Sequence, residues 1–120
     1  MLTGKIKRSN TILYCRNWEV TVKFYRDLLN FVINHESEWF VEFQVADNTY
    51  LGIANEANAS IKSAAGNGIT LSWQVEDVEK THRHLNQLGI KTGRIKLVWG
   101  SRAFYLFDPE GHRIEIWAQT

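Results

Sequence analysis

The sequence predicts an α+β fold built from two copies of a βαβββ module, and three observations support this prediction. Each half of the chain holds a strand-like segment, an amphipathic helix and then further strand-like segments. With an offset of about 60 residues Asn17 falls on Asp77, and with an offset of about 63 Leu51 falls on Ile114. A segment rich in Asn, Ala, Ser and Gly lies between the halves. We therefore expect one domain over residues 1–120, with modules of about 9–54 and 69–118 and a linker of 55–68.

The first module is predicted to contain one helix and four strands. Asn17 precedes four apolar residues at helical spacing, and Asn30 suits the left-handed position that ends a helix. The segment that begins at Trp39 alternates apolar and polar side chains, as a half-buried strand does. The strands are predicted at about residues 11–15, 31–35, 39–45 and 49–54.

The second module is predicted to repeat this order. Asp77 caps its helix, whose buried stripe includes His82, and Gly89 ends it. Pro109 fixes one backbone torsion of the closing hairpin, and Gly111 provides the positive φ of its turn. The strands are predicted at residues 69–75, within 90–97, and on both sides of the turn in 103–117.

The composition indicates a single globular domain without a strongly charged partner. The 120 residues are 44% apolar and 22% charged, with a net charge of +1. We therefore expect no nucleic-acid partner, and we interpret Lys5, Lys7 and Arg8 as a solvated tail. No window approaches the ~20 apolar residues of a membrane span, and the first residues lack the apolar core of a secretion signal. The single Cys15 is predicted to be an inert buried thiol, and its use fits a cytoplasmic protein.

Three stretches of the sequence carry a resemblance to a known family. They are Phe24–Leu29 in the first helix, Trp99-Gly100 together with Phe104, and Asp108–Glu115 in the closing hairpin. On these residues the chain resembles the vicinal oxygen chelate superfamily, which includes glyoxalase I, extradiol dioxygenases, fosfomycin-resistance enzymes and bleomycin-resistance proteins. The resemblance spans about residues 11–117. It implies that each half curls a four-stranded sheet around a cavity with its helix outside, and that the protein forms a homodimer.

Strand parity then predicts which side chains face the cavity. If Ile114 and Ile116 pack under the helix, the side chains at 113, 115 and 117 point the other way. The aromatic groups of this face suit a flat ligand, and its polar groups could orient that ligand. The candidate ligand-binding residues are Tyr14, Glu42, Tyr50, Thr70, Ser72, Gln74, Trp99, Tyr105, Phe107, Arg113, Glu115 and Trp117.

The same resemblance indicates which positions would hold a metal ion. Metal-dependent relatives bind a divalent ion through His, His and Glu from the opening and closing strands of the two halves. Those positions correspond here to Asn10, Gly52, Thr70 and Glu115, and only Glu115 is a good ligand. We therefore expect neither a metal nor a cofactor. His35, His82, His84 and His112 are predicted to be structural or solvated, and His112 is expected to be exposed.

Glu115 has several possible roles. It could be the polar anchor of the pocket, or a catalytic general base whose pKa is raised if Glu42 lies nearby. A purely structural Glu115 would instead pair with Arg113 or bond to Tyr14 or Thr70.

Two functions follow from these observations. The first is a metal-free protein that resembles the bleomycin-resistance branch and binds a small aromatic or amphipathic molecule, by sequestration or carriage. The alternative is a glyoxalase- or dioxygenase-type enzyme that uses a divalent metal or Glu115 as general base. A purely structural interaction module is a third and weaker possibility, because the cavity face is rich in polar and aromatic groups.

Overall fold

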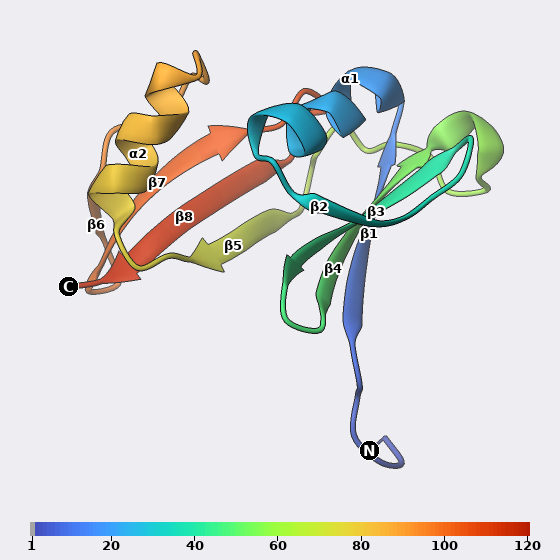
Figure 1. The fold of residues 1–120 in the computed structure, drawn as a ribbon, viewed down its shortest axis with the longest axis horizontal. Coiled ribbons are helices and arrows are strands. Elements are labelled where there is room, and N and C mark those ends of the chain that lie inside the picture. The colour runs from blue at the N-terminus through green and yellow to red at the C-terminus, as the bar shows by residue number, and fades with distance from the viewer. Residues whose placement is uncertain (1) are drawn as a thin grey trace. The chain divides into compact units, whose positions relative to one another are not determined.

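The computed structural model describes residues 2–120 and divides into two compact units, residues 1–64 and 65–120. Each unit is one four-stranded mixed sheet with a helix (Figure 1). The α+β fold with duplicated modules is therefore confirmed. That the two modules act as one domain stays a prediction.

The first unit has the sheet order β1-β4-β3-β2, in which β1 and β4 are parallel and the other pairs are antiparallel. Helix α1 follows β1 and contacts β1 and β4. Its residues continue into a π-helical turn, and Asn30, with φ of 58°, then reverses the chain. The elements are β1 (Ser9–Cys15), α1 (Trp18–Lys23), the π-helical turn (Phe24–Leu28), β2 (Val32–Glu36), β3 (Phe40–Ala46), β4 (Thr49–Asn55) and a short 3₁₀ helix (Glu56–Asn58).

The second unit repeats this topology with the sheet order β5-β8-β7-β6. Strands β5 and β8 are parallel, and helix α2 contacts β7 and β8. The side chain of Asp77 caps α2 by accepting the Lys80 N–H at 3.0 Å, and Gly89 ends it with φ of 83°. The elements are β5 (Thr70–Gln74), α2 (Val78–Gln87), β6 (Lys96–Val98), β7 (Ser101–Phe107) and β8 (Arg113–Gln119).

Burial alternates along β8, as strand parity predicts, whereas four consecutive residues of β4, Leu51 to Ala54, are buried. Ile114 and Ile116 are buried on β8, and Leu51 and Ile53 are buried on β4. Cys15 is fully buried in the first unit, as expected for an inert thiol. The opposite faces of the two sheets carry the candidate site residues.

Two predicted features differ in the structure. The strand expected within residues 90–97 is only Lys96–Val98. The segment before it makes isolated hydrogen bonds rather than a continuous strand ladder. The Gly93 N–H donates to the Tyr105 carbonyl at 2.8 Å, and the His82 ring nitrogen Nε2 lies 2.9 Å from the Gly93 carbonyl oxygen. The predicted first helix is likewise shorter as an α-helix, since its last turn is a π turn.

The expectation that His112 is exposed is wrong. Its side chain is only 6% exposed, and Nδ1 lies 2.8 Å from Asp108 Oδ2. The other oxygen of Asp108 accepts the backbone N–H groups of Glu110, Gly111 and His112, each at 2.9 Å. The carboxylate therefore organises the hairpin turn and turns the imidazole inward. Residues His35 and His84 are exposed, as expected.

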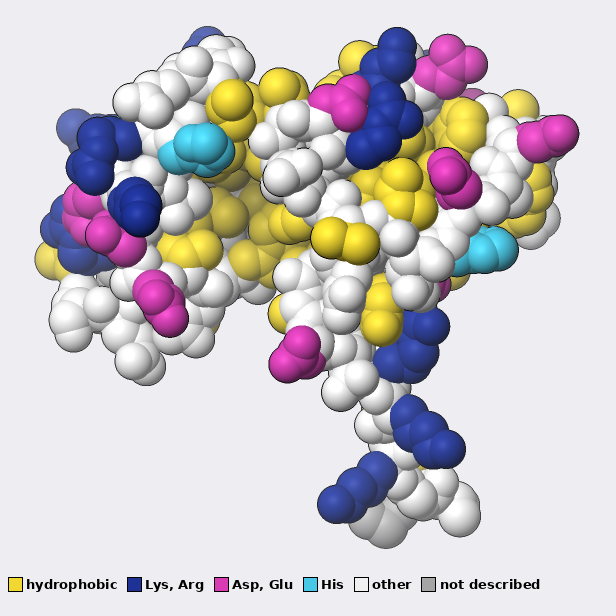
Figure 2. All heavy atoms as spheres, viewed as in Figure 1, with side chains coloured by type: hydrophobic (Ala, Val, Ile, Leu, Met, Phe, Trp, Pro, Cys, Tyr) yellow, Lys and Arg dark blue, Asp and Glu magenta, His cyan; other side chains and the backbone are white. Residues whose placement is uncertain are grey.

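Charged side chains are mixed over most of the face in Figure 2. Lys and Arg side chains lie along the amino-terminal segment, which Figure 1 shows extending from β1, and others lie at the left and the upper right of this face. Among residues 2–120, no helix has both the length and the apolar content needed to cross a membrane.

Candidate functional site

Glu115 lies at the centre of the open face of the second sheet. The strand register places Ser72 of β5 and Tyr105 of β7 level with it. Ser72 Oγ donates to Glu115 Oε1 at 2.6 Å, and Tyr105 Oη donates to Oε2 at 3.0 Å. These partners differ from those considered for a structural Glu115, because Arg113 and Thr70 are level with each other and not with Glu115.

The hydroxyl of Tyr105 is held in its protonated form. The hydrogen bond to the Glu115 carboxylate, with a smaller effect of burial, raises the pKa of Tyr105 above its ordinary value of 10.0. At neutral pH Tyr105 is therefore a hydrogen-bond donor that orients Glu115.

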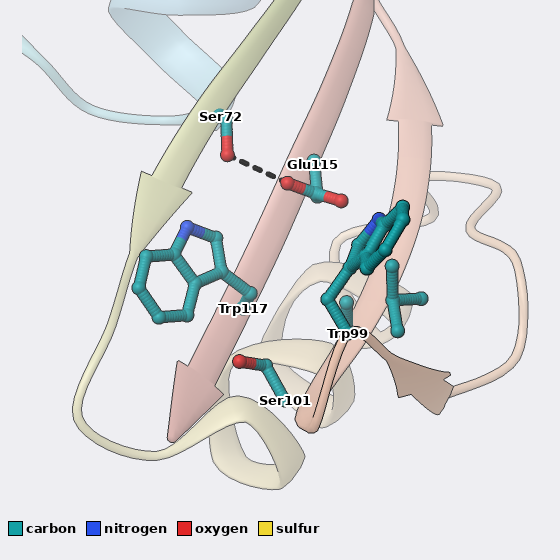
Figure 3. A pocket seen from close by; sticks show the side chains of 7 residues that line it. Ser72, Trp99, Ser101, Glu115 and Trp117 are labelled. Atoms are coloured by element: carbon teal, nitrogen blue, oxygen red, sulfur yellow. Dashed lines mark hydrogen bonds between the residues drawn. The ribbon is translucent and has the colours of Figure 1, made fainter.

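A pocket of about 180 Å³ opens beside this carboxylate. Figure 3 shows Trp117 and Trp99 on opposite sides of Glu115, with the bond from Ser72 drawn as a dashed line. A cavity of about 150 Å³ is enough for benzene, so this space suits one aromatic ring. We call it the Glu115 pocket; its lining residues are Ser72, Val98, Trp99, Ser101, Ala103, Glu115 and Trp117.

Trp99 reaches the pocket from the turn between β6 and β7. Both residues of this two-residue turn have positive φ, 54° at Trp99 and 78° at Gly100. Such turns favour Asn and Gly, and a left-handed conformation costs an ordinary residue about 1–2 kcal/mol. The Trp99 side chain is also fully exposed. Trp99 is therefore a strained and exposed indole at the edge of the pocket.

The structure divides the predicted residues of the second module into three groups. Ser72, Trp99, Glu115 and Trp117 line the pocket, and Tyr105 positions the carboxylate from beside it. The register puts Thr70, Arg113 and Phe107 level with one another on the same face, and Arg113 Nε donates to Thr70 Oγ1 at 2.9 Å.

The remaining predicted residue of this module, Gln74, is level with Trp117 in the register but does not line the Glu115 pocket. It lines a separate hollow with Val75, Glu76 and Gln119.

Sequence reasoning missed three lining residues, Val98, Ser101 and Ala103. Two of them could have been predicted, because in an alternating strand Ala103 and Ser101 lie on the same face as Tyr105. Val98 could not have been predicted, since its contribution depends on where the short strand β6 lies.

On the corresponding face of the first unit, Glu42 is surrounded by hydrogen-bond partners. This side chain is buried and receives Asn34 Nδ2 at 2.7 Å and Asn10 Nδ2 at 2.5 Å. Its Oε1 also lies 2.8 Å from the Arg8 guanidinium. Burial acts to raise the pKa of Glu42, but the bonds from Arg8 and Asn34 outweigh it and lower that pKa. The lowered pKa is the opposite of what a general base at neutral pH needs.

Arg8 is therefore more than a solvated tail residue. Its guanidinium carbon also lies 3.8 Å from the centre of the Tyr50 ring. Beside it the Phe40 ring covers Gly52, where an added Cβ would lie 2.6 Å from the ring. Tyr14 is level with Ala54 on this face and is half-buried. The three predicted residues of the first module, Tyr14, Glu42 and Tyr50, thus share a face.

The four positions that correspond to metal ligands do not fit a divalent ion. Asn10 donates its amide to Glu42, and Gly52 has no side chain. Thr70 accepts a hydrogen bond from the cationic Arg113. Among residues 2–120, no three His, Cys, Asp or Glu side chains group so as to hold a metal ion. We derive no metal-dependent chemistry from this donor set.

Comparison with known proteins places this geometry in a family. The sequence profile described as "Glyoxalase-like domain" matches residues 9–119. The chain is 28% identical to the uncharacterized protein YraH of Bacillus subtilis (strain 168), over 88% of this chain and 92% of that protein.

Solved structures show the same fold. One is a lactoylglutathione lyase from Agrobacterium tumefaciens, with a TM-score of 0.75, 20% identity, and coverage of 92% of this chain and 91% of that one. Another is TnmS3, described as an antibiotic binding protein from Streptomyces sp. CB03234, with a TM-score of 0.79, 16% identity, and coverage of 100% and 99%. The profile match over nearly the whole chain, together with the duplicated sheets, shows that this protein belongs to the glyoxalase-like domain family of the vicinal oxygen chelate superfamily.

Proposed function

We propose that this protein binds a small flat aromatic molecule in the Glu115 pocket without a metal, as a sequestering or carrier protein of the bleomycin-resistance branch in the cytoplasm. The observation that carries the proposal is the position of Glu115: its carboxylate is oriented by Ser72 and Tyr105 and lies between two indoles. Apolar walls with one oriented polar group are typical of a ligand site. The fold shared with an antibiotic-binding protein supports the same class of function.

The pocket volume limits the part of a ligand that it holds. Sites for whole drug-sized ligands are about 300–1,000 Å³, whereas the Glu115 pocket is about 180 Å³. We infer that it holds one ring or head group, and that the rest of a larger ligand extends beyond it.

The five tryptophans allow a direct test by NMR. Each indole N–H gives its own signal, assigned with Trp→Phe variants. Titration with benzamide, a neutral single-ring probe, should shift the signals of Trp99 and Trp117 saturably. Trp39, which is 40% exposed in the first unit, is the matched control and should not shift. Unmoved signals at Trp99 and Trp117 with benzamide and with its charged analogues benzamidine and benzoate, or an equal shift at Trp39, would rule out the proposed pocket.

A second candidate function is favoured by the same carboxylate. Glu115 faces a space that could hold a carbon acid, and it could act as the catalytic base that removes a proton. This activity would be seen as deuterium uptake from D₂O by an aromatic hydroxyketone, and Glu115→Gln should abolish it. Binding of benzamide by the same variant, without exchange in the wild type, would favour the binding protein.

We further propose that the protein is a homodimer. The apolar side chains of Val32, Leu97 and Phe107 are between 59% and 71% exposed, and such groups are often covered in an assembly. Light scattering coupled to size exclusion should give twice the chain mass of 13.9 kDa. A monomer mass over the micromolar range would contradict this proposal.

A further inference from the structure

The charge of Glu115 is not balanced by an ion pair. Its hydrogen-bond partners Ser72 and Tyr105 are neutral hydroxyls, and no ion pair to Glu115 occurs within residues 2–120. A carboxylate has about four acceptor positions, so roughly two are left for a ligand. Because Glu115 is the only charged residue among those that line the pocket, a ligand there meets one negative charge.

The nearest cations are engaged with other groups. Arg113 donates to Thr70, and its guanidinium carbon lies 4.6 Å from the centre of the Tyr105 ring. Lys96 Nζ lies 5.3 Å from the same centre. Arg113 and Lys96 reduce the negative potential near Glu115 from a distance, but neither residue lines the pocket. The acceptor positions of Glu115 thus remain open to a donor that enters the pocket.

The pocket walls add a second attraction for a cation. The face of an indole is the strongest cation–π acceptor among the side chains, and Trp99 and Trp117 flank the carboxylate. An N–H donor that carries charge also forms a stronger hydrogen bond to a carboxylate than a neutral donor does. Both contacts favour a flat cation over a flat neutral or anionic molecule.

In the first unit, a carboxylate and an aromatic ring already bind a planar cation that belongs to the protein itself. The Arg8 guanidinium pairs with Glu42 at 2.8 Å and stacks on the Tyr50 ring at 3.8 Å. A planar cation is therefore held there by one carboxylate and one aromatic face. The second unit offers a carboxylate and two aromatic faces without a cation in the pocket lining.

We propose that the Glu115 pocket selects flat organic cations, such as aryl amidines, aryl guanidines or protonated amino-heteroaromatics. The N–H groups of the ligand bond to the open acceptor positions of Glu115, and its plane lies between Trp99 and Trp117. This inference rests on the proposed binding function and specifies the ligand class for the same site.

Three probes of nearly equal shape test the inference with the wild-type chain. Benzamidine is cationic, benzamide is neutral and benzoate is anionic, and their affinities are measured from the Trp99 and Trp117 indole signals. Benzamidine should bind roughly five- to tenfold more tightly than benzamide, and benzoate more weakly than both. Glu115→Gln should reduce the benzamidine advantage to about twofold or less. Glu19→Gln removes the same charge at an exposed site in the first unit and should leave the affinity advantage of benzamidine over benzamide unchanged.

The outcomes separate the two proposals. If benzamide shifts the two indoles but benzamidine binds no more tightly, the choice of ligand class is overturned while the proposed function stands. Tighter binding of benzoate would overturn it too and would assign the ligand contact to Arg113. If none of the three probes moves either indole, the proposed function itself fails.

Discussion

Glu42 in the first unit and Glu115 in the second lie on corresponding faces of two sheets with the same strand order, yet their surroundings differ. Glu42 is buried, carries an ion pair to Arg8 and has two amide partners. Glu115 is half-buried, is oriented by two hydroxyls and lines a pocket. One topology therefore holds a carboxylate paired with a cation in the first unit, and in the second a carboxylate that lines a pocket.

The two faces also differ in which strand carries the bulky groups. In the first unit Phe40 on β3 is level with Ala54 on β4. In the second unit the corresponding pair is Ala103 on β7 and Trp117 on β8. The Phe40 ring covers Gly52, whereas the small Ala103 leaves room beside Glu115. The two units thus share one strand order, while the side-chain volume beside the central position of the sheet differs between them.

Removing each carboxylate in turn should give the largest difference between the two units. Glu42→Ala removes a buried carboxylate that accepts hydrogen bonds from Arg8, Asn10 and Asn34, so we expect it to lower the free energy of unfolding by about 2–3 kcal/mol. Glu115→Ala should lower it by no more than about 0.5 kcal/mol, since solvent reaches its partners. Urea denaturation at pH 7 measures both. Equal losses would show that Glu115 is also a structural group.

Filling the pocket should make the second unit resemble the first. Ala103→Phe places a ring at the position that corresponds to Phe40, and we expect at least about thirtyfold weaker binding of benzamide, or ~2 kcal/mol. Because Ala103 is 1% exposed, overpacking should also cost about 1–3 kcal/mol of stability. Fold retention is checked from the NMR spectrum. A folded variant with unchanged benzamide affinity would place the binding site elsewhere.

The smallest expected effect is the pH dependence of the first unit. The pKa of Glu42 is lowered from 4.5 because bonds from Arg8 and Asn34 outweigh the opposing effect of burial. A lowered pKa in the folded state favours the ionised carboxylate, so its stabilisation is complete above about pH 4.5. It is lost as the pH falls through the folded pKa.

The difference between the wild type and Glu42→Gln isolates this contribution. Urea midpoints measured from pH 7 down to pH 3 should show the advantage of the wild type shrinking below about pH 4.5. An advantage that is constant over this range would mean that the Glu42 carboxylate is not preferentially ionised in the folded state.

Local patterns predicted much of this fold. Apolar alternation identified the buried faces of β4 and β8, and the residues Asn30, Gly89 and Gly111 marked chain reversals with positive φ. These features depend on a residue and its close neighbours, since one torsion or one period of alternation determines them. Parity also placed Ser72, Tyr105 and Glu115 on one face, as the register shows.

The rest depended on contacts between distant segments. His112 is buried because Asp108 binds its ring within a folded turn, a contact that sequence spacing did not reveal. Arg8 reaches Glu42 only once β1 lies in the sheet.

The sequence by itself determined the duplicated βαβββ plan and the face on which Glu115 lies, because both follow from short-range periodicity and turn chemistry. Only the tertiary structure decided that Glu115 bonds to Ser72 and Tyr105 and borders an open pocket. Those properties depend on which residues of adjacent strands are level and on how much volume Ala103 and Trp99 leave between them.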